Sequence, residues 1–336
     1  MSAFLSRENL LAWLRKLLTE YRVIAPVKAW ELVLFQPVSR VEDILLDYDI
    51  TALSPKDILF PTSETLFSME KKNGRWEAQP QPEVRKQVLF GLRPCDAHGL
   101  TLTDAPFLAS PTDIHYQRRR EATTLVGLAC TRSRPECFCE SLGGGPRDPT
   151  HLDVLLVPAE GGFSVQVQTA RGAALFSRSD PENRTVTLPP APTTTRVPAE
   201  NIVQAARAAF SDAYWNRLAD RCIHCNLCAY VCPACYCFDI RDYQQKGKVE
   251  RVRSWESCQS AGFTRLAGGY DPRGTKGARL RQRFYHKFLY FPQQFQGLLG
   301  CSGCGRCVRV CPVNIDIREA IAEMQRAGAK VASGTG

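Results

Sequence analysis

The sequence has no long apolar run and lacks the short motifs that mark nucleotide-binding and hydrolytic enzymes. No apolar stretch approaches the ~18 residues that a membrane span needs, and the amphipathic residues 1–22 lack the apolar core of a signal peptide. No G-x-G-x-x-G opens a helix, residues 268–277 lack the G-K-[ST] ending of a Walker loop, and no nucleophile lies beside a convincing base. We therefore expect a cytoplasmic protein with no membrane segment, no dinucleotide or flavin site and no catalytic residues of its own.

Cysteine, in contrast, is abundant: 15 of the 336 residues are cysteines. Structural disulfides are rare in a reducing cytoplasm, where clustered cysteines more often bind metal. The chain is 44% hydrophobic and long enough for two domains with sizeable cores. The cysteines therefore point to metal chemistry in an otherwise ordinary globular protein.

Eight of the cysteines form two runs with identical spacing. The segments RCIHCNLCAYVCP, residues 221–233, and GCSGCGRCVRVCP, residues 300–312, both contain the run C-x-x-C-x-x-C-x-x-x-C-P. Bacterial two-cluster ferredoxins use this run twice, and the fourth cysteine of each run ligates the cluster of the other run. The spacing therefore predicts two 4Fe-4S clusters, the first held by Cys222, Cys225, Cys228 and Cys311 and the second by Cys301, Cys304, Cys307 and Cys232. A zinc ribbon is the alternative, but two complete runs with the closing proline favour the clusters.

Four further cysteines lie in the N-terminal half, in loop-like segments rich in Gly, Pro and Asp, each near the end of a strand-like run. They are Cys95, Cys130, Cys137 and Cys139. One hypothesis is a third iron-sulfur site, with Asp96 and His98 as neighbouring groups. The other is ordinary buried thiols, because cysteine packs as a small hydrophobe. The remaining three, Cys235, Cys237 and Cys258, receive no role from the sequence.

The two cysteine runs are separated by an unusually long basic insertion, residues 233–300. Within it, residues 241–290 hold twelve Lys or Arg against four acids, an excess of +8 in a chain whose formal net charge is +9. Three interpretations are a solvated charged face, nucleic-acid binding, and docking of an acidic partner or shielding of the anionic clusters. Because the segment contains no nucleic-acid motif, we favour partner docking or cluster shielding and expect no nucleic-acid partner.

The remaining patterns predict an α+β fold. Residues 7–22 form an amphipathic helix, QVLFGL and TTLVGLAC are buried strands, and residues 151–169 are two strands joined at Gly161 and Gly162. We expect a mixed α/β domain over 1–187, an extended linker over 188–198, and a largely helical, ferredoxin-like two-cluster domain over 199–336 that begins with a helix at 199–219.

Several motifs outside the cysteine runs give the chain a family resemblance over nearly its full length. They are SPKDILFPTSETLF (54–67), FGLRPCDAHGL (90–100), CPACYCFDI (232–240), AGGYDPRGTKGARLRQRFYHKF (267–288) and CSGCGRCVRVCPVNIDI (301–317). Together they resemble the iron-sulfur beta subunit of cytoplasmic nickel-iron sulfhydrogenases and the related iron-sulfur component of anaerobic sulfite reductase. Tyr270 departs from the histidine expected at its position, which leaves that position without an assigned role.

The resemblance implies an electron-transfer subunit of a soluble NAD(P)-linked nickel-iron hydrogenase. Such a protein relays electrons between a partner that binds flavin and NAD(P)H and the small and large hydrogenase subunits. One alternative is the same relay in an anaerobic sulfite reductase, where the electrons pass to a sirohaem protein. A free-standing ferredoxin-like carrier is another.

Overall fold

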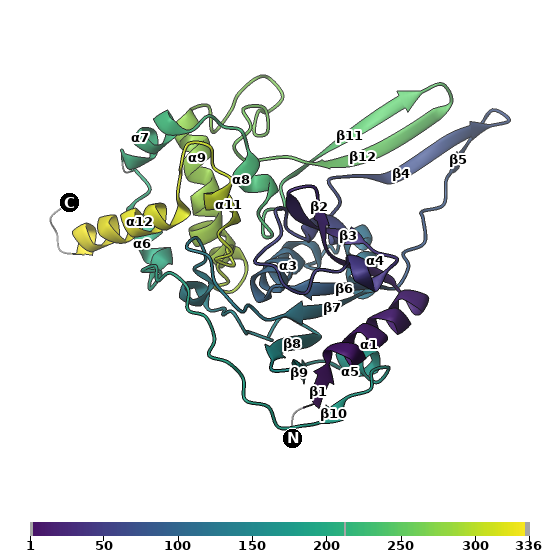
Figure 1. The fold of residues 1–336 in the computed structure, drawn as a ribbon. Coiled ribbons are helices and arrows are strands. Elements are labelled where there is room, and N and C mark those ends of the chain that lie inside the picture. The colour runs from purple at the N-terminus through teal and green to yellow at the C-terminus, as the bar shows by residue number, and fades with distance from the viewer. Residues whose placement is uncertain (1–2, 212, 333–336) are drawn as a thin grey trace.

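A computed structural model describes residues 3–211 and 213–332. It contains helices and sheets in the α+β combination that the sequence predicts. Figure 1 shows a large sheet with helices on it, a helical part formed by the second half of the chain, and a long antiparallel arm that projects from the body.

The large sheet has eight strands in the order β10-β1-β9-β8-β7-β6-β2-β3. Strands β2, β6, β7 and β8 run parallel at its centre, and the outer strands pair antiparallel. The predicted strands QVLFGL and TTLVGL are the neighbouring strands β6 and β7, every residue of which is buried, as expected for the centre of a parallel sheet. The strands span Ala3–Ser6 (β1), Arg22–Ala29 (β2), Leu32–Pro37 (β3), Gln87–Leu92 (β6), Thr123–Leu128 (β7), Val154–Ala159 (β8), Gly162–Val167 (β9) and Glu182–Asn183 (β10).

Helices cover both faces of this sheet. The predicted N-terminal helix is α1, Arg7–Glu20, whose Ser6 side chain caps its first turn by accepting from Asn9 N at 3.1 Å. Its buried face packs with α5 on one side of the sheet, and α3 and α4 pack on the other. The bounds are Lys56–Leu59 (α2), Pro94–Phe107 (α3), Ile114–Glu121 (α4) and Ala170–Phe176 (α5), with short 3-10 turns at Val41–Asp43 and Cys139–Leu142.

A second sheet joins segments that are far apart in the sequence. Its order is β11-β12-β4-β5, so the first half of the basic insertion forms a hairpin that pairs with a strand of the N-terminal half. These strands build the projecting arm of Figure 1 and span Ser63–Lys72 (β4), Arg75–Ala78 (β5), Phe238–Gln245 (β11) and Lys248–Trp255 (β12). The buried Arg253 of β12 anchors the base of the arm, because it forms an ion pair with Glu64 at 2.5 Å and another with Asp113.

The second half of the chain is largely helical. The single helix predicted for 199–219 is wrong: the structure has two helices, α6 and α7, separated by a break at which Trp215 Nε1 donates to Ala209 O at 2.8 Å. Turning the chain here lets both helices contribute to the core, where Trp215 and Leu218 pack against Phe284. The helices span Ile202–Ala208 (α6), Tyr214–Arg221 (α7), Leu227–Tyr230 (α8), Lys276–Tyr285 (α9), Phe291–Gln294 (α10), Arg306–Arg309 (α11) and Ile317–Ala332 (α12), and a π-helical turn, His286–Tyr290, follows α9.

Residues 184–199, which contain the predicted linker, form neither helix nor strand. Across residues 3–211 and 213–332, no helix has both the length and the apolar character to cross a membrane.

Candidate iron-sulfur centres

The first cavity is surrounded by the cysteines of the first run and the last cysteine of the second. It encloses about 450 Å³ of space between atoms, part of it open to solvent, and Cys222, Cys225, Cys228 and Cys311 all line it. The loop before α8 forms this cavity by taking the left-handed backbone conformation at His224 and Asn226, which turns the three thiols of the run toward one point. The structure therefore brings together the four residues that the sequence assigns to the first cluster.

Three N–H groups point at the sulfurs of this set. Ile315 N lies 3.2 Å from the Sγ of Cys311, His224 N lies 3.4 Å from that of Cys222, and Gln259 Nε2 lies 3.2 Å from that of Cys228. Donors aimed at sulfur stabilise the thiolate form, which is the form that binds iron. The chemistry of the donors and the sulfurs thus fits a cubane cluster in this cavity.

The second set gathers around Cys232. Its sulfur is an electrostatic neighbour of the thiols of Cys301, Cys304 and Cys307, all of which are surrounded by protein. Cys232 belongs to the first run in sequence, so it lies with the second run in space, as Cys311 lies with the first. The crossing that the sequence predicts is present in the arrangement of the thiols.

Buried cations surround the second set. Lys287 Nζ, on a side chain that is 3% exposed, lies 3.3 Å from Cys232 Sγ and donates to Gly300 O at 2.9 Å. Burial alone would lower the pKa of Lys287, but the thiolate charges of Cys232, Cys235 and Cys301 raise it well above its usual value. The pKa of Cys232 is lowered, first because the Cys235 S–H donates to its sulfur and then because Lys287 is near. Cys232 is thus prepared as a thiolate.

The four N-terminal cysteines also converge. Cys95, Cys130, Cys137 and Cys139 line a second cavity with about 430 Å³ of space between atoms, part of it open to solvent. Cys95 follows β6 and Cys130 follows β7, and these neighbouring parallel strands deliver both thiols to the same edge of the sheet. The carboxyl ends of parallel strands are where such folds bind ligands. Convergence of four thiols is what the hypothesis of a third iron-sulfur site requires.

The loop of the second set packs directly against the loop of the third. Gly303 has φ +66°, and a Cβ at this position would lie 2.5 Å from the Cα of Cys139, so only glycine allows this approach. The contact is fixed by Phe138 N, which donates to Gly303 O at 2.9 Å. Cys304 also lines the third cavity. The second and third sets of cysteines are therefore adjacent.

Asp96 and His98 have roles other than pointing toward the third cavity. Asp96 forms a fully buried ion pair with Arg306, in which Arg306 Nη2 lies 3.2 Å from Asp96 Oδ2. Arg306 also donates to Thr51 O at 2.9 Å, so this guanidinium ties α11 to the N-terminal half. His98 stacks on His151 with ring centroids 4.5 Å apart, and burial lowers its pKa to about 4. Both residues are structural neighbours of the third cavity and do not line it.

Burial makes most of these thiols poor acids on their own. It raises the pKa of Cys301 and of Cys139 to about 12 and that of Cys304 and of Cys130 to about 11. A bound metal centre must therefore displace these protons, and its positive charge supplies the driving force. Within the described ranges, no three His, Cys, Asp or Glu side chains are placed to hold a single metal ion. A cubane gives each thiolate its own iron, so it suits sulfurs that surround a cavity.

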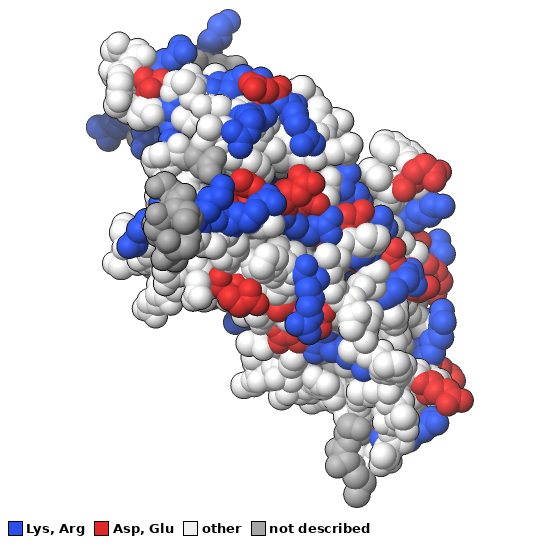
Figure 2. All heavy atoms as spheres, turned by 90° about the vertical axis from the view of Figure 1, so that its left-hand side faces the viewer, with Lys and Arg blue, Asp and Glu red and all other residues white. Residues whose placement is uncertain are grey.

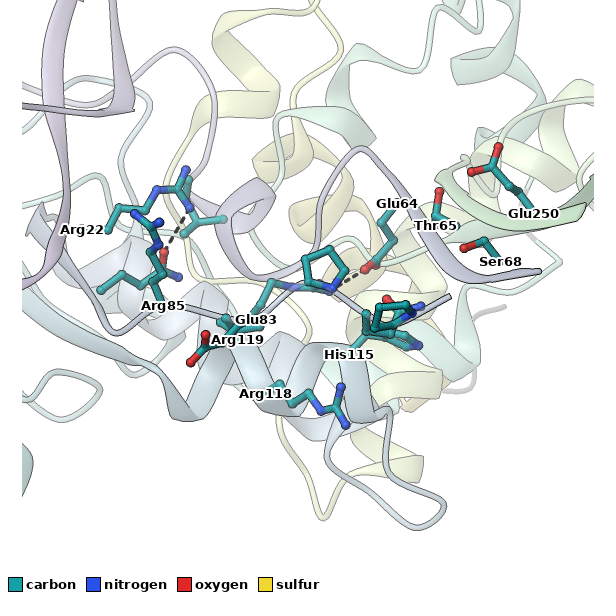
Figure 3. Close-up of a pocket in the computed structure, with 16 residues that line it drawn as sticks. Arg22, Glu64, Thr65, Ser68, Glu83, Arg85, His115, Arg118, Arg119 and Glu250 are labelled. Carbon is teal, nitrogen blue, oxygen red and sulfur yellow. Dashed lines mark hydrogen bonds and ion pairs between the residues drawn. The ribbon is translucent and has the colours of Figure 1, made fainter. Parts of the chain in front are cut away.

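Another cavity, of about 780 Å³, lies away from the cysteines. It is open and is lined by β4, the start of β6 and α4, with Arg22, Arg85 and Arg118 among its labelled side chains (Figure 3). Its acids offset part of the positive charge, since Arg119 Nη2 pairs with Glu64 Oε2 at 2.8 Å. The cavity contains no cysteine and offers no arrangement of groups that points to a reaction.

The basic insertion is divided between surface and interior. Arg283 and Lys287 are buried beside the cysteines, whereas Arg251 and Arg241 form exposed ion pairs with Asp242 and Asp239 on the arm. On the face shown in Figure 2, Lys and Arg are interspersed with Asp and Glu. Part of the basic excess is therefore placed to offset thiolate charge. Tyr270, which departs from the family pattern, is 68% exposed.

Sequence reasoning missed Gln259 and Lys287 as partners of the cysteine sulfurs. Gln259 lies beside Cys258 in a segment with no recognised pattern, and its contact with Cys228 depends on long-range packing. Lys287 did have a signal: with Arg283 it forms a pair of cations four residues apart in the otherwise aromatic segment RFYHKFLYF. That spacing places both on one side of a helix, where aromatic neighbours indicate burial.

Comparison with known proteins agrees with this geometry. The sequence model of the 4Fe-4S dicluster domain family matches residues 221–315, which contain both runs. The chain is 29% identical over 313 residues to sulfhydrogenase 2 subunit beta of Pyrococcus furiosus, and the alignment covers 88% of this chain and 90% of the relative. No solved structure matches it.

The chain is therefore an iron-sulfur protein with a 4Fe-4S dicluster domain. Its similarity to the Pyrococcus protein extends well beyond that domain and identifies it with the iron-sulfur beta subunits of sulfhydrogenases, which confirms the family resemblance found in the motifs.

Proposed function

We propose that the chain is the electron-transfer subunit of a soluble nickel-iron hydrogenase linked to NAD(P). In this role it relays electrons between a flavoprotein partner that binds NAD(P)H and the small and large hydrogenase subunits. The similarity to a sulfhydrogenase beta subunit over 88% of the chain carries the proposal. The chain's own residues support a relay because their redox-competent thiols form adjacent sets and no set of described residues suggests catalysis.

The cysteine assignments are part of the proposal. The first 4Fe-4S cluster is held by Cys222, Cys225, Cys228 and Cys311, the second by Cys301, Cys304, Cys307 and Cys232, and the third by Cys95, Cys130, Cys137 and Cys139. The clusters supply single-electron transfer when bound. The protein holds them in order, since Cys307 lies between the first and second sets and Cys304 between the second and third.

The test of the relay is recovery of the tagged full chain from its host without oxygen. We expect stoichiometric nickel-iron hydrogenase subunits and a flavoprotein in the preparation. Hydrogen should bleach the visible absorbance of the clusters, and NAD(P)⁺ should restore it. A Cys222→Ser/Cys225→Ser variant, which loses ligands of the first cluster, should assemble with the same partners but pass electrons much more slowly.

Other outcomes of this experiment identify other functions. Co-purification with a sirohaem protein in place of the hydrogenase would assign the relay to an anaerobic sulfite reductase. A chain recovered alone would instead be a free-standing carrier. Either result would refute the hydrogenase proposal.

Lys287 provides a separate prediction about the second cluster. Removing a buried positive charge beside Cys232 makes adding an electron less favourable, so Lys287→Met should lower the midpoint potential of that cluster. A Coulomb estimate with an effective dielectric constant of about 20 gives a shift on the order of 100 mV. Redox titration followed by EPR measures it.

The charge-conserving variant Lys287→Arg is the matched control and should stay close to wild type. If Lys287→Met binds its full iron yet keeps the wild-type potentials, Lys287 does not tune the cluster.

A further inference from the structure

Three cysteines lie outside the three sets: Cys235, Cys237 and Cys258. The β11–β12 hairpin brings the last two together, because Phe238 pairs with Trp255 at its base and Glu256 N donates to Cys237 O at 2.9 Å. Continuing past this pair places Cys258 beside Cys237. The same hairpin that forms the arm therefore closes on two thiols.

The sulfurs of Cys237 and Cys258 are in contact, and the contact is asymmetric. The S–H and the backbone N–H of Cys258 both donate to the sulfur of Cys237. Cys258 is buried, with 8% of its surface exposed, while Cys237 is partly exposed. Lys56, whose Nζ donates to Cys235 O at 2.8 Å, adds positive charge nearby. One thiol is thus accessible and stabilised as a thiolate, and its neighbour is enclosed.

A further metal site does not account for this arrangement. Once Cys232 serves the second cluster, only three thiols remain, fewer than the four thiolates that hold common iron-sulfur clusters. No group of three suitable side chains in 3–211 and 213–332 is placed for a single metal ion. Two sulfurs in mutual contact, one accessible and one enclosed, match instead the arrangement of a thiol and its resolving partner.

We propose that Cys237 and Cys258 form a redox-active dithiol that is oxidised by small-molecule disulfides. The Cys237 thiolate attacks one sulfur of the disulfide RS–SR, so a Cys237–S–SR bond forms and RS⁻ leaves. Cys258, after losing its proton, attacks the Cys237 sulfur, which forms the Cys237–Cys258 disulfide and releases a second RS⁻. With two protons, the balance is one protein dithiol plus RS–SR giving one protein disulfide plus two RSH.

The position of the pair connects it to the relay. Cys235 lies close to Cys258, and the Cys235 S–H donates to the sulfur of Cys232 in the second set. Two electrons delivered singly through the second cluster, with two protons, restore the dithiol. This step rests on the proposed function for its source of electrons, whereas the exchange reaction does not.

The acidity of Cys237 supports the chemistry. The hydrogen bond from the Cys258 thiol, aided by Lys56, lowers the pKa of Cys237 to about 7. An attacking thiol with a pKa near the ambient pH combines a large thiolate fraction with high nucleophilicity. The pKa of the Cys258 thiol is raised, primarily by the hydrogen bond it donates to Cys237.

The test uses the full chain with its clusters, incubated without oxygen with oxidised glutathione, quenched in acid, alkylated and digested. We expect mass spectrometry to find peptides joined through Cys237 and Cys258. In Cys258→Ser, the resolving thiol is missing, so glutathione should remain attached to Cys237. In Cys237→Ser, neither product should form, and both serine variants should keep the iron content of wild type.

Two results would overturn the proposal. One is full alkylation of Cys237 in wild type after exposure to the disulfide. The other is loss of iron from both Cys237→Ser and Cys258→Ser, which would make these residues metal ligands. Because the joined peptide is measured independently of partners and of electron transfer, a chain that fails as a hydrogenase relay can still pass this test.

The link to the relay has its own readout. When clusters are reduced and excess reductant is removed, adding oxidised glutathione should restore the visible absorbance of wild type at two cluster electrons per disulfide. Cys237→Ser should respond at least tenfold more slowly. Equal rates in the two proteins would refute electron transfer from the clusters to the dithiol.

Discussion

Replacing Cys232 with serine should remove the second cluster and leave the first intact. Cys232 ends the first run in sequence, but its sulfur lies with Cys301, Cys304 and Cys307. We expect iron to fall by roughly four atoms per chain, the content of one cubane. EPR of the reduced protein should lose the signal of the second cluster and any splitting that arises from its coupling to the first.

The matched control is Cys237→Ser, the same substitution only a few residues further along the chain. It should retain all of its iron, because Cys237 belongs to none of the three sets. Loss of the first cluster from Cys232→Ser, with the second retained, would refute the crossed arrangement.

The third cluster predicts an effect of similar size in the N-terminal half. Anaerobically purified wild type should contain roughly twelve irons per chain, against roughly eight if only the two runs bind clusters. The double variant Cys137→Ala/Cys139→Ala should lose roughly four of the twelve, because both thiols line one cavity. The EPR signals of the other two clusters should persist.

The double variant Cys237→Ala/Cys258→Ala removes the same number of thiols and should lose no iron. A Cys137→Ala/Cys139→Ala protein with wild-type iron and spectra would return these cysteines to ordinary buried thiols. Iron and sulfide analysis of the two double variants side by side decides between the two interpretations.

The third set also shows how function is linked to the fold around it. Arg93 is buried, and its Nη1 donates to Leu128 O and Ala129 O, both at 2.9 Å, at the end of β7. This guanidinium therefore joins the loop that contains Cys95 to the loop that contains Cys130. The ion pair of Asp96 with Arg306 then ties the same region to the second run. Removing either partner of that pair would leave an uncompensated buried charge.

The placement of positive charge distinguishes the first and second clusters. The sulfurs of the first set accept from uncharged N–H groups of Gln259, Ile315 and His224, whereas Cys232 lies beside the ammonium of Lys287. Nearby positive charge favours the reduced state, so we expect the second cluster to have the higher potential. Electrons should then collect at the centre of the chain, next to both the third set and the dithiol.

The sequence alone determined the chemistry of the two runs. Their spacing is local, and a tight turn that carries three thiols has few ways to present them, so the ligand sets and their crossing follow from the pattern. The buried strands β6 and β7 were also predictable, because continuous apolar runs of this length are typical of central parallel strands. The break between α6 and α7 was not, since packing of Trp215 against Phe284 outweighs the local helical pattern.

Only the tertiary structure decided what the other cysteines and cations do. Cys95, Cys130 and the pair Cys137 and Cys139 are separated by irregular intervals, so their convergence depends on the parallel pairing of β6 with β7 and on the approach of Gly303 to Cys139. Likewise, the basic excess of the insertion is visible in composition, but the burial of Lys287 beside Cys232 is not. Local spacing is encoded within one turn of chain, whereas contacts between distant segments arise from the packing of the whole fold.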